Sequence, residues 1–277
     1  MLLNFAAILS DLLISDGSSI KRLLRNLGSP EFRSLNIKQA KASDMFITSK
    51  IVLKCICQNA PSVLVNGVPV VYVSTVKYLG VLLDSTLSWH DQVVSTSQQA
   101  MSCLARLKMN SKVLSASMRR RLVAGLILPI FDYCSAVFTN ISGTLQLRLQ
   151  RKFNACIRFI FGARRFEHIT PYRRRLGWLT LRSRREFLIL SLVYKMLNMQ
   201  HHKLLHSNFK ILLDVRGRAE RRNQVLHQPA CRTVAYENSF LLTAVREWNQ
   251  LPSDLVAVNS SAEFQTLCYK LIFDKDI

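Results

Sequence analysis

The side chains best suited to chemistry in this 277-residue chain are arginines, gathered between residues 148 and 185. Within that span, twelve basic residues stand against a single acid, Glu167. Arginine binds phosphate oxygens through paired hydrogen bonds and stacks on flat rings, so this composition favours a polyanionic ligand. The candidate nucleic-acid-binding residues are Arg148, Arg151, Lys152, Arg158, Arg164, Arg165, Arg173, Arg174, Arg175, Arg182, Arg184 and Arg185.

Aromatic residues are interleaved with these cations, and most are expected in a core, with one or two stacking on bases. The cations also have alternative interpretations: a solvated basic face, or a nuclear import signal that needs no strong nucleic-acid binding. Arg182, Arg184 and Arg185 fall at a predicted helix start, where the helix dipole disfavours cations and a bound anion would relieve them. The interleaved aromatic residues are Phe159, Phe161, Phe166, Tyr172 and Trp178.

The cysteines and histidines do not indicate a metal or redox site. Seven cysteines are scattered, mostly within apolar patterns, which is typical of buried, reduced thiols. Cys55 and Cys57 are too close together for the usual zinc-binding spacing. His201, His202 and His206 have no cysteine or carboxylate within a turn, so a solvated helix end explains them better. We expect no metal and no cofactor in this chain.

The formal net charge is +21, from 38 Lys and Arg against 17 Asp and Glu. This charge indicates a polyanionic partner, nucleic acid before an acidic membrane, and we expect no small-molecule substrate. A hydrophobic fraction of 49 % argues against intrinsic disorder. No apolar run reaches the roughly 18 residues of a membrane span, and the apolar N-terminus lacks a basic leader and a cleavage site. We expect an intracellular protein, nuclear or cytoplasmic, without a membrane partner.

The elements that position these residues predict an α+β fold, with a small β part before a larger helical region. Asn66-Gly67 lies between β-branched runs, which is the pattern of a hairpin with a type I′ turn. A further strand is predicted from Val76 to Leu83. The abrupt apolar start of the chain suggests a fragment of something longer.

Apolar residues at helical spacing predict the helices that follow residue 84. One starts near Trp89, and a second runs from Ser117 to Leu128 and is ended by Pro129. In a third helix, apolar residues from Leu149 to Ile160 form one stripe and basic residues occupy the other side. Two capping boxes and a downstream proline indicate the remaining helices. These are Ser183–Leu197, Ser239–Asn249 and Ser260–Phe273.

Five short motifs occur in an order and spacing that chance does not readily produce. They are Val76–Val81 with Asp84–Trp89, Leu128–Ser135, Ile169–Tyr172, Leu176–Leu179, and Ser239–Phe240 with Trp248–Pro252. Together they resemble the C-terminal part of a jockey-type non-LTR retrotransposon reverse transcriptase. The resemblance covers the chain from about residue 5 to its end.

The resemblance implies a partial palm over 1–84, a helical thumb over 85–145 and a basic helical region over 146–277. It places primer-grip-like residues in the hairpin that ends the palm, at Tyr78, Leu79 and Gly80. The parent family copies RNA into DNA with two Mg²⁺ ions held by clustered carboxylates. Here Ser10 stands where the catalytic turn has its first Asp, which leaves Asp11 alone, and the chain contains no Asp-Asp pair. One carboxylate cannot hold two Mg²⁺ ions.

We therefore expect a catalytically inactive fragment that binds RNA or an RNA–DNA hybrid, with Mg²⁺ needed only by the intact parent enzyme. The alternatives are a nucleic-acid-binding protein unrelated to polymerases, a retained active enzyme, and a translated relic with no selected role. We also expect residues 1–60 to fold poorly, because their strands would lack partners and expose an open edge.

Overall fold

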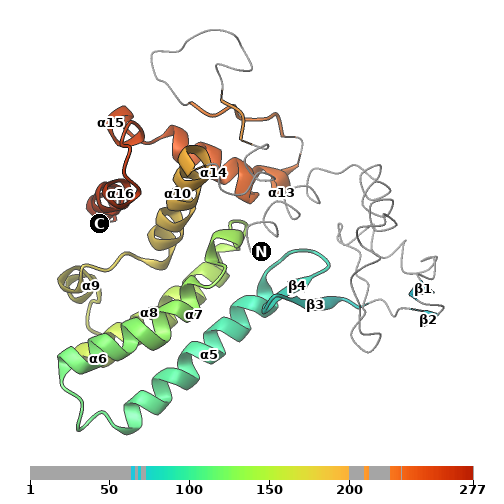
Figure 1. Ribbon diagram of the computed structural model, residues 1–277. Coiled ribbons are helices and arrows are strands. Elements are labelled where there is room, and N and C mark those ends of the chain that lie inside the picture. The colour runs from blue at the N-terminus through green and yellow to red at the C-terminus, as the bar shows by residue number, and fades with distance from the viewer. Residues whose placement is uncertain are drawn as a thin grey trace.

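A computed structural model of the chain describes residues 64–65, 68–69, 73–199, 209–211, 225–231 and 233–276. This part has an α+β structure dominated by helices, as predicted, with β-hairpins preceding the helical body (Figure 1). The predictions for Asp11, Cys55, Cys57, the histidines at 201–206 and the folding of residues 1–60 lie outside the described residues.

The described strands form two antiparallel hairpins, and Ile211 and Leu226 form a separate antiparallel bridge. Val65 pairs with Val68, which confirms the hairpin predicted around residues 66 and 67. The single strand predicted from Val76 to Leu83 is wrong, because Leu79 and Gly80 form a tight turn with φ of 47° and 85°. Two consecutive positive φ values match the twist of a two-residue hairpin. The strands are β1 (Leu64–Val65), β2 (Val68–Pro69), β3 (Thr75–Tyr78) and β4 (Val81–Asp84).

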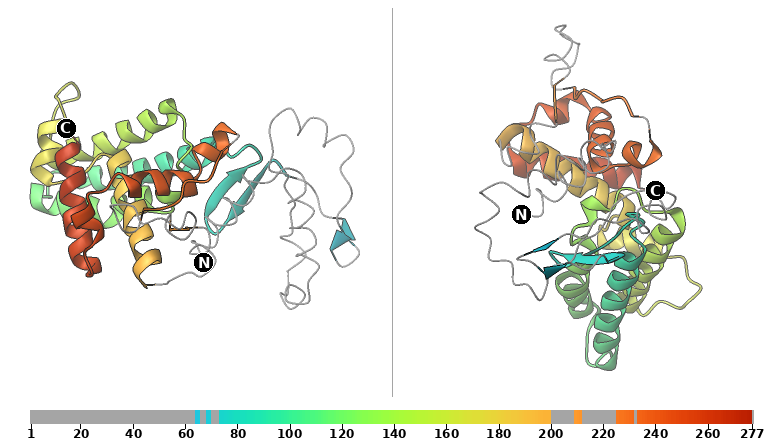
Figure 2. Two further views of the ribbon diagram at one scale, coloured as in Figure 1. Left: turned by 90° about the horizontal axis from the view of Figure 1, so that it is seen from above. Right: turned by 90° about the vertical axis from the view of Figure 1, so that its right-hand side faces the viewer.

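Helices form most of the described part. α5 packs along α8, and α10 packs against α14 and α16 (Figures 1 and 2). No helix among the described residues is long and apolar enough to cross a membrane. The helices are α5 (His90–Met109), α6 (Ala116–Leu122), the π-helix η2 (Val123–Ile127), α7 (Leu128–Asp132), the 3₁₀ helix η3 (Ser135–Val137), α8 (Gly143–Phe161), α9 (Thr170–Leu176), α10 (Leu181–Met199), α13 (Val234–Glu237), α14 (Phe240–Asn249), α15 (Ser253–Val256) and α16 (Ser261–Lys275).

The helix predicted to end at Pro129 continues through it, so that prediction is wrong. α6, η2 and α7 form one run whose middle part is a π-helix. The N–H of Leu128 bonds to the carbonyl of Val123, five residues back, and this shifts the hydrogen-bond register just before the proline. Pro129 then lies in the first turn of α7, where its missing N–H does little harm.

Two predicted capping boxes are also wrong. α10 begins at Leu181, and the hydroxyl of Thr180 accepts the N–H of Ser183 at 3.3 Å, so the cap lies three residues before the predicted one. α16 begins after Ser260 as predicted, but the Ser260 side chain accepts no capping hydrogen bond.

The buried apolar side chains form two cores. The first joins β4 and Trp89 to α10, α14 and α16. In it the rings of Tyr194 and Phe264 stack with centroids 4.2 Å apart, and the buried Trp248 lies 6.0 Å from Phe264. The second core surrounds Phe153 and joins α5, η2, α7, α8 and α9. Each core draws on more than one of the three predicted segments, and the division at residues 84 and 145 stays a prediction.

Candidate nucleic-acid interface

α8 carries the first part of the predicted basic surface on its outer side. Its predicted apolar stripe is confirmed, because Leu149, Phe153, Cys156, Ile157 and Ile160 are all buried. On the opposite side Arg148 and Arg151 are exposed, while Lys152 and Arg158 are half-buried. The outer cations of α8, here called the α8 stripe, are Arg148, Arg151, Lys152 and Arg158.

A second group of cations gathers where α6 and α9 meet the ends of α5 and α8. Arg120 donates to the carbonyl of Leu176 at the end of α9 (3.5 Å), and Arg119 donates to the carbonyl of Phe159 in α8 (3.3 Å). The first bond joins Arg120 of α6 to the end of α9, and both helices lie at one end of the described helical body (Figure 1). The exposed or half-buried cations of this region, here called the basic end, are Arg106, Lys108, Lys112, Arg119, Arg120, Arg121, Arg164, Arg165, Arg174 and Arg175.

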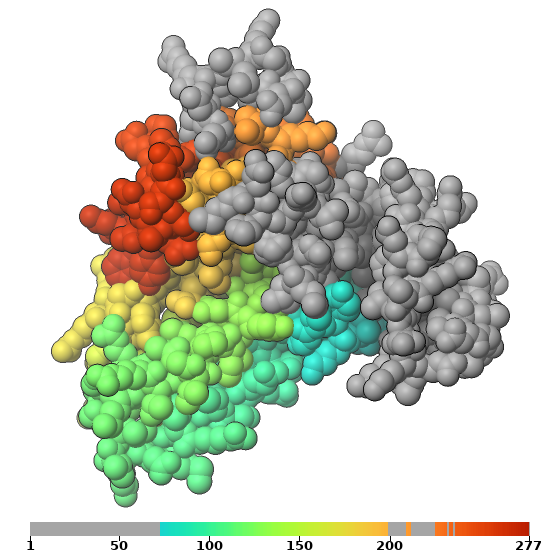
Figure 3. All heavy atoms as spheres, viewed as in Figure 1, coloured from blue at the N-terminus to red at the C-terminus, as the bar shows by residue number. Residues whose placement is uncertain are grey.

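Glu167, between α8 and α9, is the acid of the basic end, and its carboxylate is already engaged. It accepts the hydroxyl of Tyr172 at 2.6 Å and the N–H of Arg164 at 2.8 Å. These hydrogen bonds, the one from Tyr172 first, hold the pKa of Glu167 below its usual value. In the space-filling view, α9 reaches the surface between the green helices and the red α16 (Figure 3). Apart from the half-buried Arg119, which donates to the Ser111 and Phe159 carbonyls, the cations of the basic end are exposed, and the carboxylate of Glu167 is bound internally.

Arg173 has a structural role instead of the predicted surface role. Its side chain is only 6 % exposed, and its guanidinium donates to the Asp276 carboxylate at 2.8 Å. It also donates to the carbonyls of Trp178 and Asp276, both at 2.9 Å. Arg173 thus joins α9 to the end of α16 and is not counted in the basic end.

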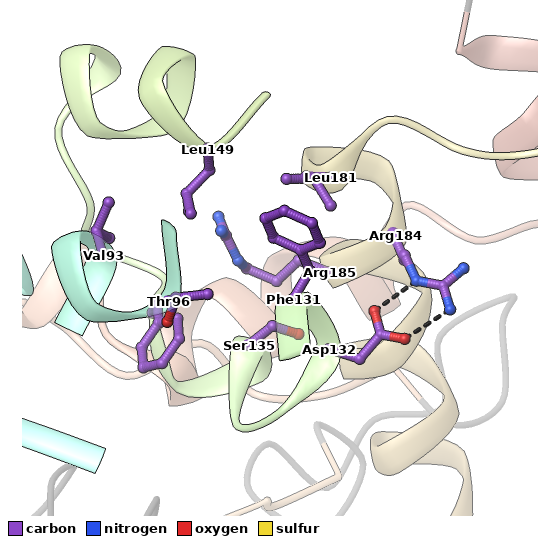
Figure 4. A pocket seen from close by; sticks show the side chains of 10 residues that line it. Val93, Thr96, Phe131, Asp132, Ser135, Leu149, Leu181, Arg184 and Arg185 are labelled. Carbon is purple, nitrogen blue, oxygen red and sulfur yellow. Dashed lines mark hydrogen bonds and ion pairs between the residues drawn. The ribbon is translucent and has the colours of Figure 1, made fainter. Parts of the chain in front are cut away.

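Arg184 also turns inward, away from the predicted interface. Its guanidinium forms a two-pronged pair with the Asp132 carboxylate, with N–O distances of 2.5 and 2.6 Å (Figure 4). Burial alone would lower the pKa of Arg184, but the Asp132 carboxylate raises it above its ordinary value. The pair joins α10 to α7.

Arg185 extends into an apolar region near Leu149 and Phe131 (Figure 4). The space left there is only about 10 Å³, which leaves no room for a ligand. The guanidinium donates to the Gln146 side chain at 3.0 Å. Burial, followed by repulsion from Arg182, lowers the pKa of Arg185 to about 10, so the group stays charged at neutral pH. Arg185 therefore contributes mainly to the packing of α10, and it also lines an open cleft beside the start of that helix.

The N-terminus of α10 receives its negative charge from within the chain. The Asp276 carboxylate accepts the N–H of Thr180 at 2.7 Å and the Thr180 hydroxyl at 3.2 Å. A carboxylate at a helix N-terminus is favourable, because it faces the positive end of the dipole. A bound anion was predicted to offset the unfavourable position of the arginines at this helix start. The carboxylate of Asp276 supplies that negative charge instead, and the carboxylate of Asp132 supplies it for Arg184.

Arg182 is exposed and lines an open cleft of about 670 Å³ beside the start of α8, α10 and α14. Two carboxylates share this cleft with the cations. Burial, and then repulsion from Glu247, raise the pKa of Glu186 above its usual value. This cleft therefore carries both positive and negative charges, whereas the basic end carries almost only positive charges. Its charged lining residues are Arg182, Arg185, Glu186, Arg246, Glu247 and Lys275.

The primer-grip-like residues lie at the tip of the β3–β4 hairpin. Tyr78 and Leu79 are 45 % and 36 % exposed. The Tyr133 hydroxyl, just after α7, donates to the carbonyl of Leu79 at 2.5 Å, and a Cβ added to Gly80 would lie 3.3 Å from that hydroxyl. The tip is thus fixed to the helical body at the end of the described helices opposite α9 (Figures 1 and 2).

The three arginines of α6 precede the densest basic span of the sequence and were not among the predicted binding residues. The available signal was a repeated triplet: residues 119–121 and 173–175 both read Arg-Arg-Arg and are both followed by leucine. What the sequence did not show is that Arg120 of the α6 triplet reaches the Leu176 carbonyl, directly after the α9 triplet.

The described residues contain no group of three or more His, Cys, Asp or Glu side chains that could hold a metal ion. No protein-family model matches the chain, and neither a curated protein nor a solved structure matches it. The functional proposal therefore depends on the geometry and charge of the site.

Proposed function

We propose that the chain binds the phosphate backbone of RNA or of an RNA–DNA hybrid through the α8 stripe and the basic end. The observation that carries this proposal is the one-sided charge. Residues 101–185 hold two acids, Asp132 and Glu167, and both carboxylates are engaged in internal hydrogen bonds. The outward arginines therefore repel one another unless a polyanion covers them, and their fork of donors suits phosphate oxygens.

We further propose that the chain derives from the C-terminal part of a jockey-type reverse transcriptase and lacks polymerase activity. Support comes from the motif residues, which form joints between distant elements. In the Leu128–Ser135 motif, Tyr133 binds the Leu79 carbonyl of the first motif. In the last motif, the Asn249 side chain binds both the N–H and the carbonyl of Leu226 at 2.9 Å. Residues of the motifs therefore make hydrogen bonds that connect segments far apart in the sequence.

A filter-binding titration with single-stranded RNA, over a series of KCl concentrations, tests the binding function. If six phosphates are neutralised, log K should fall with log salt at a slope of about −4. An RNA–DNA hybrid and duplex DNA of the same length show which nucleic acid is preferred. A flat salt dependence would contradict the proposal.

Primer extension with Mg²⁺ and a homopolymer template tests the absence of polymerase activity, with an intact reverse transcriptase as the positive control. We expect no incorporation, because a single Asp in the catalytic turn cannot hold two Mg²⁺ ions. Measurable incorporation would refute this part. The genomic sequence just upstream tests the ancestry separately: a recognisable fingers region supports it, and an unrelated promoter opposes it.

A further inference from the structure

One of the five aromatic residues interleaved with the cations faces solvent, while the other four are packed. Phe159 and Trp178 are 7 % and 8 % exposed, and Phe161 lies against Tyr172 with ring centroids 5.1 Å apart. Phe166 is 92 % exposed, more than any other large hydrophobic side chain among the described residues. The structure thus singles out one aromatic residue that contributes nothing to either core.

The loop between α8 and α9 presents Phe166 from a closed turn. The N–H of Glu167 donates to the Arg164 carbonyl at 3.3 Å, and the Glu167 carboxylate accepts the N–H of Arg164 at 2.8 Å. From α8, Arg158 donates to the carbonyls of Arg164 (3.3 Å) and Glu167 (3.4 Å). From α9, the Tyr172 hydroxyl donates to the other carboxylate oxygen of Glu167 at 2.6 Å. Both flanking helices therefore fix the ends of the turn, and its middle projects.

Exposed cations precede and follow the projecting ring in the chain, and one of them lies over it. Arg164 and Arg165 precede it and are exposed, and the Arg165 guanidinium lies 5.9 Å from the centroid of the Phe166 ring. Arg174 and Arg175 are exposed on the following helix. A ring in this setting suits a partner that combines negative charge with flat, stackable faces, and a nucleic acid has both.

We propose that the Arg164–Glu167 turn is a stacking site for one unpaired nucleobase, with Phe166 as the platform and Arg164 and Arg165 binding the flanking phosphates. This inference rests on the proposed nucleic-acid binding and adds a preference to it. Bases within a duplex already stack on their neighbours, so their faces are closed to a side chain. Bases in single strands, loops and strand ends present a free face. The turn therefore selects an unpaired stretch over a continuous duplex.

The test compares a single strand and a duplex of one sequence, each containing the fluorescent base 2-aminopurine, with the full chain. Phe166→Ala should weaken single-strand binding about tenfold and relieve the quenching of the fluorescent base, while duplex binding is unchanged. Phe166→Trp should keep both the tight single-strand binding and the quenching of the fluorescent base, because tryptophan also presents a flat ring. Val234→Ala is the matched control, since Val234 is also exposed (72 %) and lies on α13. Urea unfolding of each variant confirms that the fold is intact.

The salt dependence separates this inference from the proposed function. Phe166→Ala should leave the slope of log K unchanged because the ring is uncharged, whereas Arg174→Gln should reduce it by about 0.7. If Phe166→Ala binds the single strand as tightly as the unaltered chain, the stacking site is refuted and the binding function stands. Equal losses on single strand and duplex, or burial of Phe166 by a protein instead of an oligonucleotide, would also refute it. If the unaltered chain binds no nucleic acid, both proposals fail.

Discussion

Arg173, Arg174 and Arg175 follow one another in α9, yet they occupy different surroundings. The Arg173 side chain is 6 % exposed and bound to Asp276, whereas the other two face solvent. Successive side chains on an α-helix are about 100° apart, so a triplet spreads over most of the circumference. On a helix that packs by one side, one member of such a triplet turns to the core and the others remain available to a ligand.

Replacing Arg173 by alanine should lower the free energy of unfolding by about 3–5 kcal/mol, because the nearly buried Asp276 carboxylate loses its charged partner. Arg174→Ala is the matched control: we expect a change within about 0.5 kcal/mol in stability but a shallower salt slope for RNA binding. Urea unfolding followed by circular dichroism measures the first quantity. Similar destabilisation by both substitutions would contradict the assignment of Arg173 to structure and Arg174 to the surface.

The prediction of buried thiols holds only in part for the five described cysteines, because Cys103 and Cys134 are half-buried. Cys156 and Cys268 are free and buried, and burial raises the pKa of each to about 12. Both thiols therefore stay protonated at neutral pH and are poor nucleophiles. Cys231 is the exposed exception.

At the scale of elements, the β3–β4 hairpin depends on two residues in the left-handed region. Leu79 has φ of 47° and Gly80 has φ of 85°. The leucine tolerates this conformation while Tyr133 holds its carbonyl at 2.5 Å, and the glycine leaves room for the same tyrosine ring. Since Val81 and Leu83 belong to the first core, strain in this turn is transmitted to the helical body.

Gly80→Ala should destabilise the chain by about 1–2 kcal/mol, because an L residue is strained at this φ and its Cβ would press on the Tyr133 hydroxyl. Gly143→Ala is the control, because Gly143 opens α8 with nothing within 4 Å of the added Cβ. There the change should be neutral or stabilise by about 0.5 kcal/mol. Hydrogen exchange of the β3 and β4 amides, together with urea unfolding, measures both effects. An unchanged hairpin in Gly80→Ala would refute the role given to this turn.

Features that follow from the apolar periodicity of a single helix were predictable from the sequence. Features that depend on contacts with residues far away in the sequence were not. The buried and exposed sides of α8 follow directly from its periodicity. The burial of Arg173 depends on Asp276, 103 residues away, and nothing near Arg173 in the sequence reveals it. The turn at Leu79-Gly80 was missed because it lacks the Asn-Gly signature. The prediction that Pro129 ends a helix failed because the π-helix before the proline shifts the hydrogen-bond register.

At the scale of the whole molecule, the described helices place the hairpin tip and the basic end at opposite ends (Figures 1 and 2). At physiological ionic strength, charges are screened over about 8 Å. A cation far from the basic end therefore adds to the net charge of +21 but interacts weakly with phosphates bound there. Affinity for nucleic acid should follow the position of the charges rather than their sum.

Two double variants with the same net charge test this. Arg174 and Arg175→Gln remove two exposed cations from the basic end, and Lys195 and Lys210→Gln remove two exposed cations from the end of α10 and the segment after it. Lys195 lies about 20 Å along α10 from its start, given a rise of 1.5 Å per residue. The arginine pair should weaken RNA binding and reduce the salt slope by about 1.4, because two phosphate contacts are lost. The lysine pair should leave the slope nearly unchanged. Equal reductions in both variants would show that net charge alone governs binding, and would remove the case for a localised interface.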